Sequence, residues 1–196
     1  MSYVSIYGIP LKSPVRLLGE VHNSHRGAAV IWDIIGETYC GVDGFPWGRE
    51  NRDLAREIWG KWKDPEVPFE HRFVLASTMD RVMIRRDHVA ELIRCMEVFD
   101  HDFPGRTNLA GQIEILRPVL NGRLVAVGWN QTSIGGSPWQ VPGRRGFRKF
   151  NLSRDILVNP LYDSSGPAVW VPIYDGQVFM IDGKYMLTGL QEIPPL

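Results

Sequence analysis

The sequence predicts a single α+β domain, in which a mainly antiparallel sheet with a C-terminal β-meander is packed by three or four helices. Three observations support this fold class. The 196 residues fit one domain and are enough to bury a core. Apolar residues recur at helical spacing in the first two thirds of the chain, whereas the last third has short apolar runs separated by Asp-Gly turns.

The chain is expected to begin with two strands followed by a helix. Residues 3–9 alternate in character, and residues 15–21 form a second extended run. Apolar side chains then recur every three or four positions, which predicts a helix over 25–39. Asn23 or Ser24 is its expected N-cap, because a short oxygen-bearing side chain satisfies the free N–H groups of a first turn.

The middle of the chain is expected to supply a helix, a hairpin and a further helix. Residues 49–62 carry apolar side chains at four-residue steps, which predicts the first of these helices. Residues 72–77 and 81–85 are apolar runs and are predicted as the arms of a hairpin. Asp87 is the expected cap of the second helix, which continues to Phe99.

The remaining elements complete the predicted sheet. A short helix is expected over 109–116 and a strand over 123–131. Three C-terminal strands follow, separated by Asp-Gly pairs in which glycine tolerates the positive φ of a tight turn. Their predicted ranges are 168–174, 177–181 and 184–190.

Composition narrows the class of protein. Lysine plus arginine and aspartate plus glutamate number 22 each, so overall charge does not favour a protein that coats nucleic acid. The first ten residues lack the basic and apolar regions of a signal peptide, and no apolar run approaches the length of a membrane span. Cys40 and Cys95 are predicted to be free thiols packed as small hydrophobes. We therefore expect a cytoplasmic protein without a membrane partner.

A long basic loop, rich in glycine and proline, is expected over residues 132–154 of the single domain 1–196. Arginine and aromatic side chains are typical anchors of protein interfaces. Arginine can also bind phosphates and aromatic rings can stack on bases, as a nucleic-acid site requires. Alternatively, the arginine and lysine residues of the loop neutralise the acidic segment 155–196. The residues predicted to bind a partner protein are Trp129, Trp139, Arg144, Arg145, Phe147, Arg148 and Lys149.

A second candidate site lies where the second strand leads into the first helix. Its side chains suit a carboxylate or phosphate, because a helix N-terminus offers free N–H groups and cations lie beside it. Capping and packing is the ordinary alternative, and a metal held by two imidazoles and a carboxylate is another, although the spacing is unspecific. The predicted anion-binding residues are His22, Asn23, His25 and Arg26.

The function expected from these patterns is a non-catalytic interaction protein, immunity- or inhibitor-like, that binds another protein through loop tryptophan and arginine residues. Neither a phosphate-binding glycine loop nor a nucleophile elbow occurs in the sequence, so no catalytic residue, metal or cofactor is assigned. One alternative is an enzyme or sensor for a phosphorylated small molecule that uses His22, His25, Arg26 and the basic loop. A nucleic-acid-binding module is the other alternative.

Overall fold

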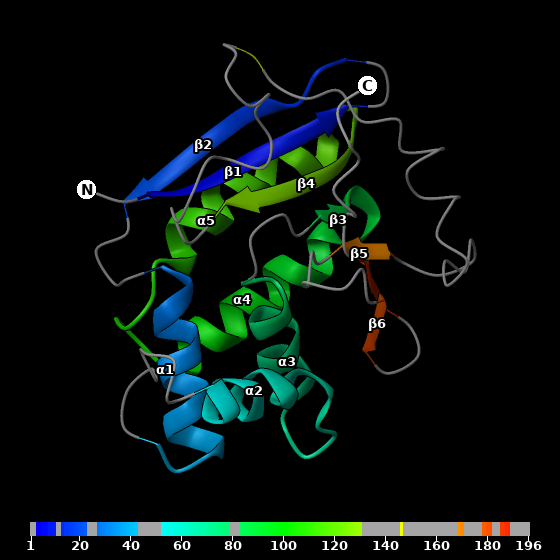
Figure 1. The fold of residues 1–196 in the computed structure, drawn as a ribbon. Helices are drawn as coiled ribbons and strands as arrows, with labels where there is room; N and C mark the ends of the chain where they lie inside the picture. The colour runs from blue at the N-terminus through cyan, green and yellow to red at the C-terminus, as the bar shows by residue number, and fades with distance from the viewer. Residues whose placement is uncertain are drawn as a thin grey trace.

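The α+β fold is confirmed by a computed structural model, drawn in Figure 1. The structure describes residues 3–10, 13–22, 27–42, 52–78, 83–130, 146, 168–170, 178–181 and 185–188. Most of the predicted basic loop lies outside these residues, so the prediction of a long loop over 132–154 is not tested.

Seven strands of the described residues form one sheet in the order β2-β1-β4-β3-β5-β7-β6. The two N-terminal strands and β4 are antiparallel neighbours and form the longest part of the sheet. Their positions agree with the predictions from alternating side chains. The strands are β1 Tyr3–Pro10, β2 Arg16–His22, β3 Met83–Arg85, β4 Leu124–Asn130, β5 Ala168–Trp170, β6 Val178–Ile181 and β7 Tyr185–Thr188.

The C-terminal strands exist where the sequence predicts them, but the predicted meander is wrong in its pairing. β6 and β7 form the expected antiparallel hairpin. β5 instead pairs with β7, in parallel, and lies between β7 and β3. Residues 171–177 separate β5 from β6, which is longer than a two-residue turn. The chain between them therefore does not oblige the two strands to be neighbours.

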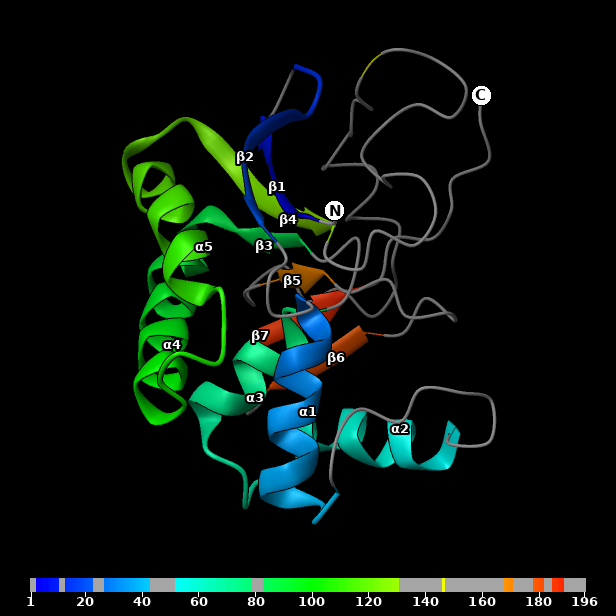
Figure 2. The same cartoon turned by 90° about the vertical axis from the view of Figure 1, so that its left-hand side faces the viewer.

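Five α-helices and three short 3-10 helices occupy the described residues. Figure 2 shows α5 against one face of the β1, β2 and β4 part of the sheet, with α4 beside it, while α1, α2 and α3 lie toward the other end of the molecule. The helices are α1 Ala28–Tyr39, α2 Arg52–Gly60, α3 Phe69–Ala76, α4 Val89–Asp102 and α5 Leu109–Leu116, with η2 Lys61–Lys63, η3 Arg86–His88 and η4 Arg117–Asn121.

Helix α5 approaches β2 closely because glycines line the contact. A Cβ added to Gly19 of β2 would lie 2.8 Å from Cδ1 of Ile115, and one added to Gly111 of α5 would lie 3.0 Å from Cγ1 of Val21. The face of the sheet that includes Gly19 and its register partner Ile6 is therefore the helix-facing side. A side chain at either glycine would force helix and strand apart.

Both faces of the central strand β1 are buried. Ile6 is fully buried on the helix-facing side, and Tyr7 and Ile9, which point to the opposite face, are buried as well. The paired strand β4 repeats the pattern, since Ala126 and Val127 are both buried. A strand buried on both faces is stabilised along its whole length, so this part of the sheet is the centre of the fold.

The predicted hairpin of residues 72–77 and 81–85 is wrong in its first arm, which belongs to α3. The apolar run from Phe73 to Ala76 is buried on every side, and a short run of this kind has no amphipathic period to separate helix from strand. The second arm is β3, which pairs with β4 and β5.

Two helix starts differ from prediction. α1 begins at Ala28 rather than at residue 25, and its N-cap is Gly27, at φ 55°, rather than Asn23 or Ser24. The helix predicted over 49–62 is described from Arg52, and it gives way to η2 after Gly60. Asp87 lies in η3, before α4, and accepts a hydrogen bond from Arg85 through its carboxylate.

Within the described residues, no helix combines the length and apolar character required to cross a bilayer.

Candidate functional site

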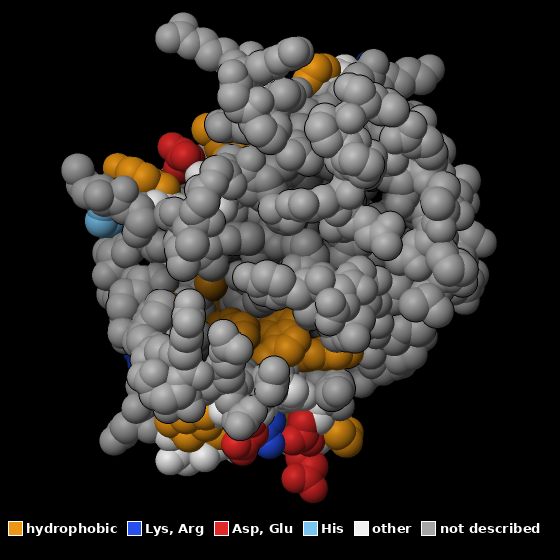
Figure 3. All heavy atoms as spheres, in the orientation of Figure 1, with side chains coloured by type: hydrophobic (Ala, Val, Ile, Leu, Met, Phe, Trp, Pro, Cys, Tyr) orange, Lys and Arg blue, Asp and Glu red, His pale blue; other side chains and the backbone are white. Residues whose placement is uncertain are grey.

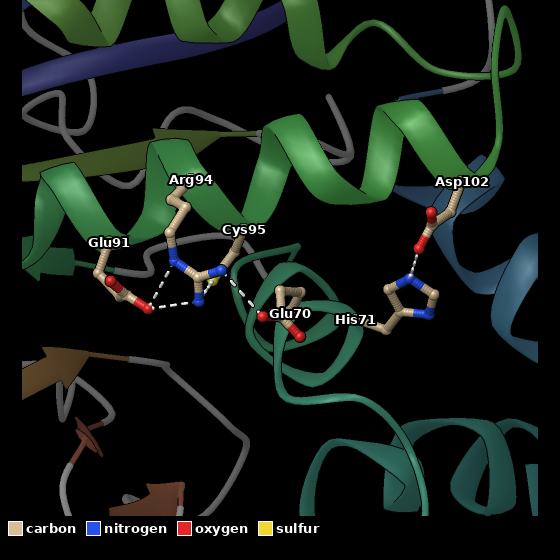
Figure 4. A network of polar contacts seen from close by, with 6 residues as sticks. All are labelled: Glu70, His71, Glu91, Arg94, Cys95 and Asp102. Carbon is tan, nitrogen blue, oxygen red and sulfur yellow. Dashed lines mark hydrogen bonds and ion pairs between the residues drawn. The ribbon is translucent and has the colours of Figure 1, made fainter.

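A chain of three polar side chains connects α1, α3 and α4. Tyr39 is the last residue of α1, His71 lies in the first turn of α3, and Asp102 ends α4. Oη of Tyr39 lies 2.6 Å from Nδ1 of His71, and Nε2 of His71 lies 3.0 Å from Oδ2 of Asp102. Figure 4 shows the contact between His71 and Asp102. We call these residues the Tyr39–His71–Asp102 chain.

The two ends of this chain meet different environments. The His71 side chain is only 5% exposed, whereas that of Asp102 is 41% exposed. Phe99 and Phe103 flank the imidazole, with ring centroids 5.0 Å and 5.2 Å from its own. The aromatic rings therefore exclude water from His71 and leave the carboxylate in contact with solvent.

The hydrogen-bond partners define where the protons lie. Hydrogen bonds from His101 and from His71 lower the pKa of Asp102, so its carboxylate is ionised at neutral pH and only accepts. Nε2 of His71 therefore carries the hydrogen that is donated to Asp102. When the ring is neutral, Nδ1 is then an acceptor, and the Tyr39 hydroxyl donates to it.

The Tyr39–His71–Asp102 chain has the connectivity of a hydroxyl, a base and an orienting carboxylate. Burial, and then the negative charge of Asp102, raise the pKa of Tyr39. An activated nucleophile requires the opposite change, a pKa low enough to yield the anion. The arrangement therefore holds the phenol in its protonated form and links three helices.

A second polar network, also in Figure 4, links α3 with α4 at the surface. Arg94 of α4 donates to Glu91 through Nε at 3.1 Å and Nη2 at 2.7 Å, and through Nη1 to Glu70 of α3 at 2.9 Å. Its side chain is about half exposed, so the pairs add little stability but fix the guanidinium toward α3.

The two cysteines are free thiols, as the sequence predicts. Cys95 is fully buried, and burial raises the pKa of its thiol to about 12, which keeps it protonated. Cys40 is half-buried, and burial followed by the charge of Glu57 raises its pKa too. Neither environment favours a thiolate. In the part of the chain described, no three or more His, Cys, Asp or Glu side chains gather as a metal site.

Trp129 is a core residue, which corrects its assignment to a partner-binding surface. Its side chain is 0% exposed, and its indole N–H donates to Oε1 of Gln112 on α5 at 3.1 Å. Trp129 lies opposite Ile6 on β1, so it points to the helix-facing side of the sheet. The other predicted partner-binding residues, Trp139, Arg144, Arg145, Phe147, Arg148 and Lys149, lie outside the described residues.

Of the predicted anion-binding residues, only His22 is described. It ends β2, is exposed, and meets the ring of Tyr3 edge-on at 5.4 Å between centroids. Asn23, His25 and Arg26 lie outside the described residues. The N-cap of α1 is Gly27, which has no side chain to cap the helix, and no acidic residue occupies the first turn.

Two exposed apolar side chains occur on the paired strands β1 and β2: Tyr3 is 40% exposed and Leu17 is 42% exposed. Leu120 of η4, on a different element, is 40% exposed. Tyr3 pairs with His22, while Glu20 and Leu17 pair with the next alternate residues of β1, Ser5 and Tyr7. All four side chains therefore lie on the face of the sheet opposite α5. We call these four residues the β1–β2 row. Figure 3 shows hydrophobic, acidic and histidine side chains together at the N-terminal end of this ribbon.

Three tryptophans form a cluster where α1 meets α2 and η2. The rings of Trp32 and Trp59 stack, with centroids 5.5 Å apart and planes 10° from parallel, and Trp62 lies beside Trp59. Trp62 is buried, and the other two are half-buried against the core. Nε1 of Trp32 donates to Thr78 at 2.8 Å, which fixes the ring.

Sequence patterns do not reveal the Tyr39–His71–Asp102 chain. Its members are separated by 32 and 31 residues and come together only when three helices pack. The residues 100–102 resemble an ordinary polar end of a helix. His71 lies between Glu70 and Arg72, just before the apolar run 73–76, so its own neighbours in the sequence do not indicate that it is buried. Comparison of the chain with protein-family models, curated proteins and solved structures found no match.

Proposed function

We propose that the protein is a cytoplasmic, non-catalytic interaction protein, immunity- or inhibitor-like, that binds another protein. The observation that carries the proposal is the β1–β2 row, in which Tyr3 and Leu17 expose apolar surface beside Glu20 and His22. Interfaces combine apolar and aromatic contacts with polar side chains around them. Leu17, Glu20 and His22 of the row lie on β2, the terminal strand of the sheet, so a partner can approach them from the side as well as from above.

The internal use of reactive groups supports the same proposal. The Cys95 thiol is buried with a raised pKa, and the hydroxyl of the Tyr39–His71–Asp102 chain stays protonated. Arg94 donates hydrogen bonds to the carboxylates of Glu70 and Glu91. Arg94 and the Tyr39–His71–Asp102 chain link helices to one another, and the Cys95 thiol is packed in the core. The basic loop residues Trp139 and Arg148 remain part of the proposed surface on the basis of the sequence.

Leu17→Lys tests the proposal, with Leu120→Lys as a matched control of nearly equal exposure on a different element. The tagged variants and the wild type are purified from the native cells. We expect one stoichiometric protein with the wild type and with Leu120→Lys, and its loss with Leu17→Lys and with the double variant Trp139→Ala, Arg148→Ala. Melting temperatures should stay unchanged. Retention of the partner by both test variants, or unfolding of both, would contradict the proposal.

A second candidate is an enzyme or sensor for a phosphorylated small molecule. It is favoured by the exposed His22, which ends β2 before the chain leads into α1, because a helix N-terminus offers N–H groups to an anion. His25, Arg26 and the basic loop would complete such a site. Calorimetric titration with pyrophosphate should then show binding that His22→Ala weakens. Heat signals equal to buffer dilution would remove this candidate.

A further inference from the structure

His71 is a buried titratable group, 4% exposed, that links α3 to two other helices. Among the described residues, the titratable groups that face it from other elements are Tyr39 of α1 and Asp102, with its neighbour His101, of α4. On α3 itself, the adjacent Glu70 is engaged by Arg94. Glu37 and Arg106, further out on α1 and after α4, pair with each other at 2.8 Å.

When the imidazole of His71 is neutral, each donor in the Tyr39–His71–Asp102 chain has one acceptor. The Tyr39 hydroxyl donates to Nδ1 of His71, and Nε2–H of His71 donates to Asp102. This matching requires that Nδ1 carries no hydrogen. The contact between Tyr39 and His71, at 2.6 Å, is short for a hydrogen bond and joins α1 to α3.

A second proton on His71 disrupts one half of this arrangement and strengthens the other. Nδ1–H would face the hydroxyl of Tyr39, which is also a donor, so the hydroxyl must turn its hydrogen away. A phenol oxygen is a weaker acceptor than an imidazole nitrogen, because its lone pair is delocalised into the ring. The cationic ring would meanwhile donate a charge-assisted hydrogen bond to the ionised Asp102.

We propose that His71 is a proton-sensitive switch in the attachment of α1: the neutral imidazole holds α1 to α3 through Tyr39, and the protonated imidazole releases that contact and holds α3 to α4 through Asp102. Histidine changes charge between about pH 5 and pH 8. Asp102 stays ionised at the acidic end of this range, since its pKa is lowered. The neighbouring pair Trp32 and Trp59 joins the same helix α1 to α2.

The test is Tyr39→Phe, which removes one hydroxyl and keeps the ring against His71. Urea unfolding of wild type and variant is followed at about pH 8 and about pH 5, on either side of histidine's ordinary range. We expect the substitution to lower the folding equilibrium constant roughly five-fold at the higher pH, the contribution of one hydrogen bond. At the lower pH the two proteins should differ by less than about two-fold.

Tyr3→Phe is the matched control, because Tyr3 also contacts a histidine, through its ring. It should change the folding equilibrium equally at both pH values. A Tyr39→Phe effect that is equal at both pH values, or larger at the lower one, would overturn the proposal. Nitrogen NMR of the wild type gives an independent readout: at the higher pH His71 should carry its hydrogen on Nε2, and a hydrogen on Nδ1 would also overturn it.

Discussion

Replacing Trp129 by phenylalanine tests whether this side chain supports the core or contacts a partner. The substitution keeps an aromatic ring between β4 and α5 but removes the indole N–H. Oε1 of Gln112 then loses its donor, and Gln112 is only 2% exposed, so water does not readily replace it. The variant should therefore be destabilised even though it stays aromatic.

The expected loss has two parts. A buried acceptor left without its partner costs about 1 to 3 kcal/mol, and the smaller ring leaves a space in a fully buried site. Together these lower the free energy of unfolding by about 2 to 4 kcal/mol. Trp129→Ala removes the whole ring and should cost about 3 to 5 kcal/mol or more.

Urea unfolding, followed by circular dichroism, measures this change. With a slope of about 2 kcal/mol per molar urea, the midpoint for Trp129→Phe should fall by roughly 1 to 2 M. The folded variant should still bind the partner as tightly as wild type. An unchanged midpoint combined with lost partner binding would refute the assignment of Trp129 to the core.

Three other outcomes follow from the geometry. Gly19→Ala should destabilise the protein by about 1 to 3 kcal/mol, because its Cβ would press on Ile115, whereas Gly60→Ala, with nothing within 4 Å, should be neutral or slightly stabilising in urea unfolding. Asp102 has a lowered pKa when folded, so its contribution is present above its unfolded pKa and lost as pH falls through the folded value; Asp102→Asn should flatten the acid limb of the stability profile. The Cys95 thiol should react with a thiol reagent only after unfolding, and rapid reaction in the native state would contradict its burial.

The parts of the fold that sequence reasoning located correctly are those with a clear local period. The stripe in α4 is decided by one surface of the helix, so nearby residues suffice to reveal it. α3 has no such period because it is buried all round, and its run was therefore taken for a strand. The parallel pairing of β5 with β7 depends on contacts between segments that are not adjacent, which local patterns do not encode.

The candidate site was less accessible to sequence reasoning than the fold. The assignment of Trp129 to a partner surface rests on the general preference of tryptophan for interfaces. Its position opposite Ile6 in the sheet instead directs the side chain toward the core. The hydrogen bonds of His71 depend on the packing of three helices, and no spacing along the chain predicts them. By contrast, the inert character of Cys95 was inferred correctly, because it follows from residue type and the absence of a partner motif.

The most direct test of the proposed interaction is the dissociation constant of the purified partner for wild type, Leu17→Lys and Leu120→Lys. A charge placed in the β1–β2 row should weaken binding by about ten-fold or more, while the same charge on η4 leaves the affinity unchanged. Equal affinities for all three proteins, or equal losses in both variants, would contradict a partner surface on this ribbon.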